Sequence, residues 1–403
     1  MTTTPLAPLS GIRVLDFSRV LAGPFATMLL ADMGADVLKI ESLQGDDTRQ
    51  WGPPWFGAGE QRESAYFLSV NRNKRSLALN LKSPQAQAIA RDMAADSHVV
   101  VENFKPGGMD GFGLGFTSLH TLNPALVYAS LTGYGQTGPA RDFPGYDFVI
   151  QGQSGMMSIT GPAEGEPAKL GVAISDVIAG LFAAVSMLGA LRHAERTGEG
   201  QQVDIALFDT SIAVLVNIVS GALVSGQPPA RYGNAHPSIV PYQPFEARDR
   251  SFTVAVGNDR QFAALCGLLG HAAWAADPRF ATNPARVEHR EVLIELLAPE
   301  FRRRNAEAWT ADLRALGIPA GPINDVLTAL HDPQVAARGL IHEVDVLGET
   351  LRLIGPAVGF SATPPGIYAP PPRLGQHTDA VLHERLRLSD ADIARLRESG
   401  AVG

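Results

Sequence analysis

IRVLDFSRVLAGPFATMLLADMGADVLKIES, residues 12 to 42, is the stretch of the chain that decides the fold. Residues 12 to 18 form an apolar, β-rich run that predicts a buried strand, and residues 36 to 42 predict a second strand. Between them, residues 23 to 35 predict a helix, because Pro24 suits the first turn of a helix and Gly34 suits its end. This order of strand, helix and strand predicts two parallel strands joined by a covering helix.

The same alternation continues along the next hundred residues. Apolar runs at 75–81, 99–104 and 126–135 predict further strands, and Ser83 with Pro84 predicts the start of a helix between the first two. The fold class is therefore α/β, with a Rossmann-like parallel sheet covered on both faces. In such folds ligands bind at the carboxyl ends of the strands, which are followed here by the loops 18–24, 41–49, 102–108 and 132–139.

The remainder of the chain predicts a second, smaller α/β domain. At 403 residues the chain is longer than one hydrophobic core usually serves. A long apolar helix at 171–197, a strand at 201–209 and a second apolar helix extend the first domain. A separate segment then brings a strand at 252–257 and helices between 260 and 316. We assign residues 1–226 to the large domain, 227–325 to the small domain, and 326–403 to a segment that returns to the large one.

Composition excludes several classes of protein. With 45% hydrophobic and 18% charged residues, the chain resembles ordinary globular proteins rather than disordered ones. A net charge of −8 argues against a nucleic-acid-binding surface. Cys266 is the single cysteine and lies in an apolar helical run, so it predicts a core residue, no internal disulfide, and a reducing, cytoplasmic compartment.

No membrane segment is expected. The first eleven residues lack the basic and apolar regions of a secretory signal. The apolar stretches 177–191 and 212–224 are shorter than the roughly 18 to 20 residues that span a bilayer, so both are expected to form buried core helices.

The basic residues divide unevenly. Of the 33 Lys and Arg, only five are lysines, all within the first 169 residues: Lys39, Lys74, Lys82, Lys105 and Lys169. A residue bias of the organism with chance placement explains this pattern unless other observations single out those positions.

Asp176 is the first candidate for chemistry. It lies in the first turn of the long apolar helix, among small residues that would let a ligand approach closely. A buried, rigid helix is a good support for a reacting group, and a carboxylate at a helix N-terminus is expected to stay ionised, as a nucleophile must. A cap or dipole partner is the more common role of such an acid, and spacing alone favours that role.

Other candidates are weaker when taken alone. Tyr146 and Asp147 are a second pair, although a packed tyrosine and a capping aspartate would explain them. Asn103, Lys105 and Lys82 follow predicted strand ends, where a phosphate-bearing ligand would bind, although solvated surface charge is the common role of lysine. No motif of a zinc protease, a nucleotide-binding P-loop or a serine hydrolase occurs, so no metal and no cofactor is expected.

These residues together carry a family resemblance. The chain resembles the class III (CaiB/BaiF, formyl-CoA transferase-like) CoA-transferases in PLSGIRVLDFSRVLAGPFATMLLADMGADVLKIE (8–41), NRNKRSLALNLK (71–82), VENFKPG (101–107), GYGQTGP (133–139), the Asp176 segment and LGQHT (374–378). The segments 51–55, 66–76, 231–245, 317–324 and 370–378 further resemble the branch that includes succinate–hydroxymethylglutarate (glutarate) CoA-transferase.

The resemblance implies a function and a set of site residues. Asp176 would attack an acyl-CoA thioester, and CoA would pass through aspartyl anhydride and aspartyl-CoA intermediates to a carboxylic acid such as succinate or glutarate, with no ATP or metal. Tyr146 and Asp147 would lie beside Asp176. The residues expected to line the CoA site are Val20, Leu21, Ala22, Leu79, Lys82, Asn103, Phe104 and Lys105. The fold implied is an interlocked homodimer, and the partners are the two substrates and a second copy of the chain.

The acyl selectors are the least determined part of the site. A second carboxylate on the substrate requires a cation or hydrogen-bond donor, and Arg19, Arg72, Arg231 and His236 are the candidates. Departures from the formyl-CoA branch, with Gly111 in place of an arginine and NAHPSIVPYQ in place of a glycine-rich tetrad, argue against formyl or oxalyl transfer.

Two alternatives remain. An α-methylacyl-CoA racemase of the same fold needs a histidine base where this chain has Tyr146, and a tyrosine with the usual pKa near 10 is a poor base at neutral pH. A CoA-binding protein that has lost its chemistry is the alternative of another class, and the intact Asp176 segment argues against it.

Overall fold

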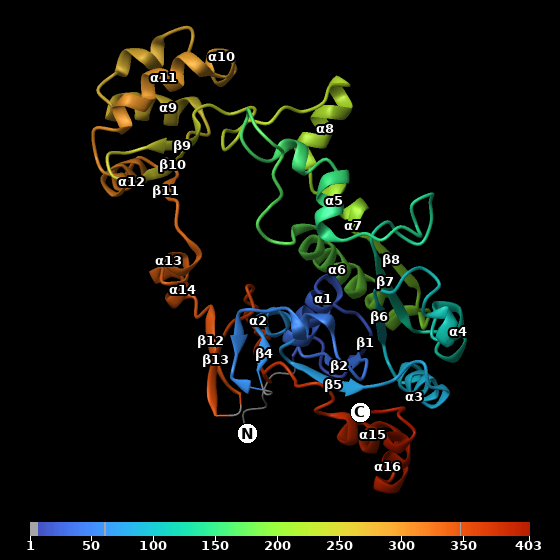
Figure 1. Cartoon of the computed structure of the whole chain (residues 1–403). Helices are drawn as coiled ribbons and strands as arrows, with labels where there is room; N and C mark the ends of the chain where they lie inside the picture. The colour runs from blue at the N-terminus through green and yellow to red at the C-terminus, as the bar shows by residue number, and fades with distance from the viewer. Residues whose placement is uncertain (1–6, 60–61, 347) are drawn as a thin grey trace. The chain divides into compact units, whose positions relative to one another are not determined.

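The computed structural model describes residues 7–59, 62–346 and 348–403, which form two compact units (Figure 1). The first six residues, on which part of the signal-peptide expectation rests, lie outside this description. The first unit contains the chain up to Met156, Leu170–Val224 and Gln334–Gly403, and the second contains Met157–Lys169 and Ser225–Pro333.

Residues 157–169 belong to the second unit, although the division of the sequence at 227 left them in the large domain. Arg231 is one link between this segment and the rest of the second unit, because its guanidinium donates to the backbone oxygens of Ser158, Pro162 and Gly165. These bonds join two segments more than sixty residues apart, which a division drawn along the chain does not detect.

A six-stranded parallel sheet forms the centre of the first unit, as the alternation of strands and helices predicted. Its strand order is β5-β2-β1-β6-β7-β8. From β1 the chain builds outward through β2 to β5 on one side and through β6 and β7 to β8 on the other, so the order reverses between β1 and β6. The strands are β1 (Arg13–Asp16), β2 (Asp36–Glu41), β5 (Lys74–Ala78), β6 (Val99–Glu102), β7 (Val127–Thr132) and β8 (Gln202–Ala206).

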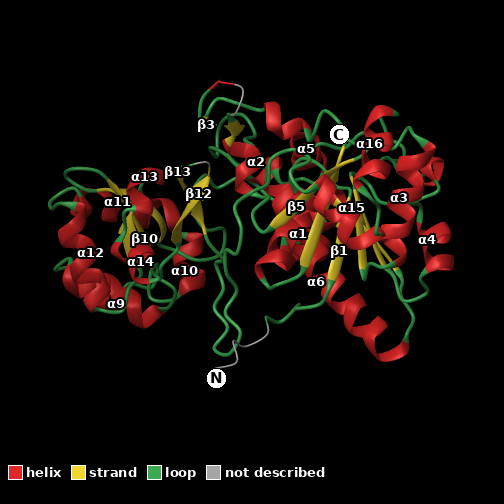
Figure 2. Ribbon diagram, turned by 90° about the horizontal axis from the view of Figure 1, so that it is seen from below, coloured by secondary structure: helices red, strands yellow, loops and turns green. Residues whose placement is uncertain are grey.

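Helices cover both faces of this sheet (Figure 2). One face packs on α1 (Ala22–Asp32) and α6 (Ile174–Thr197), with α5 (Asp147–Gln153) and α7 (Leu207–Ala213) at its edge. The other face packs on α3 (Pro84–Ala95), α4 (Phe116–Leu122) and two helices from the end of the chain, α15 (Thr378–Leu386) and α16 (Asp390–Glu398). The C-terminal segment therefore completes the core of the first unit.

The contact between α1 and α6 is unusually close. A Cβ atom on Gly180 would lie 2.7 Å from the backbone oxygen of Ala22 and 3.0 Å from Cδ1 of Phe25. Only a glycine leaves room for this approach, which holds the first turns of both helices together.

The apolar helices differ from expectation in their burial. By length and composition alone, α6 could cross a membrane, as could α7 and α8 (Val216–Ser225) taken as one bent pair. Helix α6 packs on α1, β7 and β8, which is typical of a core helix. The expectation that residues 212–224 form a buried helix is wrong for the single chain, because α8 contains no buried residue and Leu223 is 81% exposed.

The second unit has its own core. An antiparallel sheet of β9 (Tyr242–Glu246), β10 (Ser251–Ala255) and β11 (Ala320–Pro322) packs with α9 (Asp259–Leu268), α11 (Arg290–Phe301) and α12 (Ala306–Ala315), and α10 (Asn283–Glu288) completes the unit. Cys266 is buried in this core, as its apolar surroundings predicted.

Short elements complete the chain. The first unit also contains β3 (Trp55–Phe56), β4 (Glu63–Ser64), α2 (Ala65–Ser69), β12 (Ile341–Val346) and β13 (Glu349–Ile354), and α13 (Val326–Leu330) and α14 (Pro333–Ala337) lead toward the C-terminal segment.

Candidate active site

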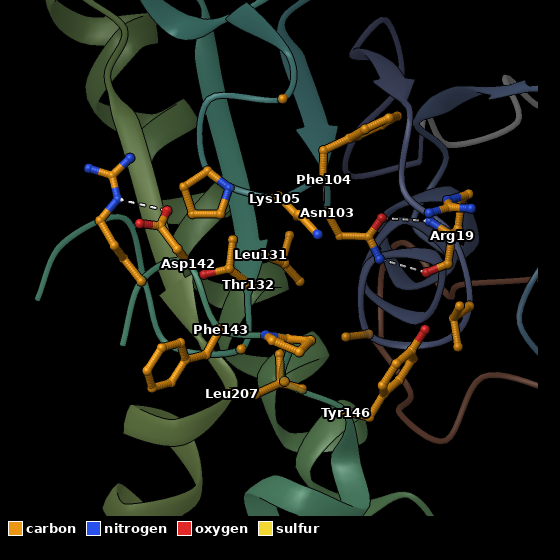
Figure 3. Close-up of a pocket in the computed structure, with 18 of the residues that line it drawn as sticks. Arg19, Asn103, Phe104, Lys105, Leu131, Thr132, Asp142, Phe143, Tyr146 and Leu207 are labelled. Carbon is orange, nitrogen blue, oxygen red and sulfur yellow. Dashed lines mark hydrogen bonds and ion pairs between the residues drawn. The ribbon is translucent and has the colours of Figure 1, made fainter. Parts of the chain in front are cut away.

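A cavity of about 460 Å³ opens at the carboxyl ends of the sheet strands (Figure 3). Its walls come from the loops after β1 and β6, the end of β7, the loop that precedes α5, and the starts of α6 and α7. The loops after parallel strands meet at one edge of the sheet, so residues far apart in the sequence converge there. Asp176 and Tyr146 both line this cavity, together with Val20, Ala22, Asn103, Phe104 and Lys105.

A second cavity, of about 660 Å³, adjoins the first. The two share Arg19, Asp47, Phe104 and Phe112 as walls. Leu79 and Lys82, which follow β5, line the second cavity. The two cavities together therefore extend along the carboxyl edge of the sheet from β5 to β8. Such a groove suits an elongated ligand with one end at Asp176.

Asp176 is the third residue of α6, and Ala173, at the N-cap position of α6, gives the helix no side-chain cap. The carboxylate of Asp147, the first residue of α5, takes this role, because its Oδ1 accepts the backbone N–H of Ser175 at 2.8 Å. Asp147 thus holds the turn that carries Asp176. The two acids therefore lie close together in the structure, and Asp147 binds the backbone and is not part of the cavity wall.

The surroundings of Asp176 oppose the ionisation that its place at a helix N-terminus led us to expect. Burial, and then the negative charge of Asp147, raise the pKa of Asp176 to about 7. The sequence suggested only the favourable helix N-terminus, whereas the fold adds an apolar setting and a second carboxylate, and both oppose ionisation. A carboxylate with a raised pKa is a stronger nucleophile when it is ionised.

The loop between β1 and α1 is strained and held in place. Val20 has a φ of 71°, a conformation that a β-branched residue rarely adopts. The Asn103 side chain fixes this turn, since its Oδ1 accepts from Arg19 N at 2.9 Å and its Nδ2 donates to Arg19 O at 2.7 Å (Figure 3). Asp46 accepts from Val20 N at 3.3 Å. Asn103 therefore joins the loops after β1 and β6, where the strand order reverses, and it presents the backbone of Val20 to the cavity.

Four of the five lysines divide into two pairs with different roles. Lys39 and Lys74 are completely buried: Lys39 Nζ donates to Asp46 at 2.8 Å, and Lys74 Nζ donates to Pro24 O at 2.9 Å and pairs with Asp16 at 3.3 Å. Burial lowers the pKa of Lys74 to about 8.

Lys82 and Lys105 are exposed on the walls of the two cavities. Among the described residues neither ammonium has an ion pair. These two lysines are therefore available to an anionic ligand, whereas Lys39 and Lys74 support the loops from beneath.

The remaining candidates have varied positions. Leu21 packs with Met28 and Val70 and lines neither cavity. Arg19 lines both cavities and pairs with Asp47 at 2.9 Å. Arg72 is buried in a two-point ion pair with Asp32, at 2.9 and 2.6 Å, so the expectation that it reads the acyl group is not supported.

Arg231 and His236 belong to the second unit. The Arg231 guanidinium is bound to three backbone oxygens, as described above. His236 Nδ1 accepts from Ser238 N at 3.0 Å, and its ring lies 5.3 Å from that of Tyr242. Both side chains are held by their own unit.

Two residues near Asp176 were missed by the sequence analysis. Tyr66, on α2, packs against the same small apolar cluster of Leu21, Met28 and Val70 as Ala173 and Val177, the latter being the residue after Asp176. Burial, and then the charges of Asp176 and Asp147, raise the pKa of Tyr66 to about 12, so its phenol remains a hydrogen-bond donor. Arg141 lines the same cavity as Asp176 and lies 3.5 Å from Asp142. Tyr66 belongs to the family-like segment 66–76, which was the signal available for it.

No cluster of three or more metal-ligating side chains occurs among the residues that the structure describes.

Comparison with known proteins agrees with this geometry. The model of CoA-transferase family III matches residues 9–378. The chain is 46% identical to a succinate–glutarate CoA-transferase of Agrobacterium fabrum, over 94% of this chain and 95% of that protein. It is 41% identical to the human succinyl-CoA:glutarate CoA-transferase, over 98% and 90% of the two chains. The crystal structure of a CaiB/BaiF family protein from Brucella suis is similar, with a TM-score of 0.84 and 43% identity over 94% and 99% of the two chains.

Proposed function

Because the chain belongs to the class III CoA-transferase family and is a CoA-transferase, we propose that it moves CoA reversibly between two dicarboxylic acids. Succinyl-CoA is the donor that we favour, with glutarate or a related acid as acceptor. The single observation that carries the proposed mechanism is Asp176 at the inner end of a groove that suits an acyl-CoA.

In the first half of the proposed reaction, an ionised Asp176 carboxylate attacks the thioester carbonyl of the donor. The C–S bond breaks, CoA leaves as a thiolate, and the acyl group is held as a mixed anhydride with Asp176. The thiolate then attacks the aspartyl carbonyl of the anhydride. This step releases the donor acid as a carboxylate and leaves CoA as an aspartyl thioester.

The second half runs the same steps in the opposite direction. The acceptor carboxylate attacks the aspartyl thioester and forms a new anhydride, with CoA thiolate as the leaving group. The thiolate attacks the acceptor's acyl carbon, which gives the product thioester and regenerates the Asp176 carboxylate. The energy of the thioester is kept in covalent bonds throughout, so the proposed mechanism uses no ATP, metal or cofactor.

The groove supports this assignment through its charges. Lys105 and Lys82 are exposed cations at the first and second cavities, where they can neutralise the phosphates of CoA. Asn103, Val20 and Ala22 bring backbone close to the ligand, and Phe104 provides an apolar wall. We propose that the nucleotide end of CoA occupies the second cavity and that the thioester reaches Asp176 in the first.

The acyl end requires groups that recognise a second carboxylate. Arg141 and Arg19 line the cavity that contains Asp176, and Tyr66 keeps a phenol proton close by. We propose that these groups, with Tyr146, receive the acyl chain. A contribution from Arg231 and His236 of the second unit stays a prediction.

We also propose that the protein is an interlocked homodimer. In the single chain, Val185 on α6 is 70% exposed, and Leu223 and Val224 on α8 are 81% and 90% exposed. Exposed apolar side chains on two helices are typical of an interface. A second copy of the chain would cover them, as the family resemblance implies.

The cytoplasm is the compartment that we propose. The single cysteine, Cys266, is buried and unpaired, so the fold makes no use of an oxidising environment.

Racemisation is not favoured. The relatives described above are named as CoA-transferases, and Tyr146 rather than a histidine lines the cavity with Asp176. A binding protein without chemistry is also disfavoured, since the site keeps a half-buried carboxylate, Asp176, whose pKa is raised to about 7.

The test is to trap the intermediate on Asp176. After incubation with succinyl-CoA, hydroxylamine should convert the activated side chain to a hydroxamate, and borohydride should reduce the aspartyl thioester, both detectable by mass spectrometry of the Asp176 peptide. Asp176→Ala should abolish adduct and CoA exchange, whereas Asp209→Ala, an exposed acid on α7, should keep both. Full exchange activity in the Asp176→Ala variant would exclude the mechanism.

The identity of the acid pair needs a separate measurement. A panel of acyl-CoA donors and free acids, read by mass spectrometry, should show the highest kcat/KM for dicarboxylic pairs. Equal rates with monocarboxylic acids would contradict the proposed substrate class.

A further inference from the structure

The side chain of Gln151 is completely buried in α5, close to the start of α6, although it lines neither cavity. Its Nε2 donates to Asp147 Oδ2 at 2.8 Å, and its Oε1 accepts from the backbone N–H of Leu170 at 2.9 Å. The amide thus has one donor bond and one acceptor bond, so its orientation is determined by both partners.

Through Asp147, these hydrogen bonds are connected to the turn of α6 that contains Asp176. The other oxygen of Asp147, Oδ1, accepts the backbone N–H of Ser175 at 2.8 Å. Leu170 and Ser175 are the two ends of the segment that leads into α6, and each is bound to one member of the pair formed by Gln151 and Asp147. The segment 170–175 is therefore held at both ends by α5.

We infer that Gln151 is a positioning residue for Asp176: it holds the Asp147 carboxylate and the Leu170 amide in place, and thereby the first turn of α6. This inference rests on the proposed function of Asp176 as nucleophile. Gln151 does not touch the substrate, so it acts on the rate of attack rather than on substrate binding.

A carboxylate at position 151 cannot replace the amide. Its two oxygens can accept from Leu170 N–H but have no proton for Asp147, and its charge repels the Asp147 carboxylate. Positioning errors of about 1 Å at a reacting group can cost about 100-fold in rate. The expected effect of losing this link therefore lies in kcat.

The first experiment compares Gln151→Met with Gln153→Met. Gln153 lies on the same helix but is exposed, and its Oε1 accepts from the Tyr134 hydroxyl, so it controls for loss of a glutamine and its hydrogen bond from α5. We expect Gln151→Met to lower kcat by roughly 10- to 100-fold, with the KM for acyl-CoA within about threefold of wild type. Gln153→Met should leave both constants close to wild type.

The second experiment exchanges the amide and the carboxylate, so that position 147 donates the hydrogen bond and position 151 accepts it. Gln151→Glu alone should lower kcat at least as much as Gln151→Met. In the double variant Asp147→Asn/Gln151→Glu, the new amide at position 147 can donate to the new carboxylate at position 151. The amide oxygen can still accept from Ser175, and the carboxylate can still accept from Leu170. We expect the double variant to recover about tenfold in kcat over Gln151→Glu. If Gln151 only filled space in the core, the second substitution would not restore kcat.

Hydrogen–deuterium exchange gives a readout that does not depend on turnover. The amides of residues 170–176 should exchange faster in Gln151→Met than in Gln153→Met, and return toward wild type in the double variant. The inference would be overturned if the amides of residues 170–176 exchanged in Gln151→Met as they do in Gln153→Met. It would also be overturned if the double variant had no higher kcat than Gln151→Glu, and this second comparison remains possible even if Gln151→Met fails to fold. If the wild-type protein transfers no CoA while exchange changes as expected, the proposed function fails and the link between Gln151 and this segment stands.

Discussion

Asp176 combines two opposing influences on its carboxylate. The N-terminus of α6 favours the ionised form, whereas burial and the charge of Asp147 favour the protonated form and raise the pKa of Asp176 to about 7. If Asp176 is the nucleophile, as proposed above, its ionised form is present at neutral pH and is more reactive than an ordinary aspartate. The protonation state of Asp176 is therefore expected to control the rate.

The dependence of activity on pH follows from this. Only the ionised form attacks, so kcat/KM should rise as pH increases through about 7 and should level off above it. In Asp147→Asn the neighbouring negative charge is absent, so the pKa of Asp176 falls and the midpoint of this rise should move to lower pH. Initial rates between roughly pH 5 and pH 9 measure both midpoints.

The matched control is Asp209→Asn, which removes an exposed acid from α7. Its midpoint should equal that of the wild-type protein. A midpoint that does not move in Asp147→Asn would mean that burial alone sets the pKa of Asp176.

The identity of a residue was informative where its side chain lines the cavity at a strand end, and misleading where its side chain pairs with another buried charge. Asp176, Asn103 and Lys105 were identified from motif and position, and all three line the cavity. Arg72 looked like a substrate-binding cation, but it pairs with Asp32, forty residues earlier. Long-range ion pairs of this kind leave no signal in the local sequence.

At the scale of elements, the crossing of α1 and α6 places two parts of the site together. Val20 and Ala22 precede or begin α1, Asp176 lies in the first turn of α6, and Gly180 is the point of closest approach. The small residues of the Asp176 segment are thus explained by packing as well as by access for a ligand.

Substitution of alanine for two different glycines of α6 should change the stability of the protein in opposite directions. Gly180→Ala places a Cβ 2.7 Å from a backbone oxygen, so it should destabilise the protein by about 1–3 kcal/mol. Gly189→Ala meets nothing within 4 Å, and it should stabilise the protein by about 0.5–1 kcal/mol through the helix propensity of alanine.

Chemical denaturation of the two variants and the wild-type protein measures these differences. A Gly180→Ala variant as stable as Gly189→Ala would show that α1 and α6 are free to separate at this point.

The strands and long helices were predictable because their signals are local. Alternation of apolar runs with helical periodicity identified β1, β2, β5, β6 and β7. The exposure of α8 in the single chain was not predictable, because an apolar sequence does not show whether its own chain covers the helix.

At the scale of the whole molecule, the exposed apolar residues of α6 and α8 predict association. Light scattering should give a mass of twice 42.8 kDa for the wild-type protein. Because Val185 and Leu223 are 70% and 81% exposed in the single chain, the double variant Val185→Asp/Leu223→Asp should shift the protein toward the monomer, since it would bury two charges in the interface.

Glu195→Gln is the control, because Glu195 is an exposed polar residue on α6. It should leave the mass unchanged. A wild-type protein that is monomeric at micromolar concentration would exclude the homodimer.

The sequence by itself determined the order of strands and helices, the parallel sheet and the family, and it pointed to Asp176 as the proposed nucleophile, because each depends on short-range periodicity or on a run of adjacent residues. The tertiary structure alone decided that residues 157–169 join the second unit, that Asp147 and Gln151 hold the turn before Asp176, and that the pKa of Asp176 lies near 7. These properties arise from hydrogen bonds, charges and burial between residues brought together by folding. Their strength depends on distances and on exclusion of water, which no local pattern of residues specifies.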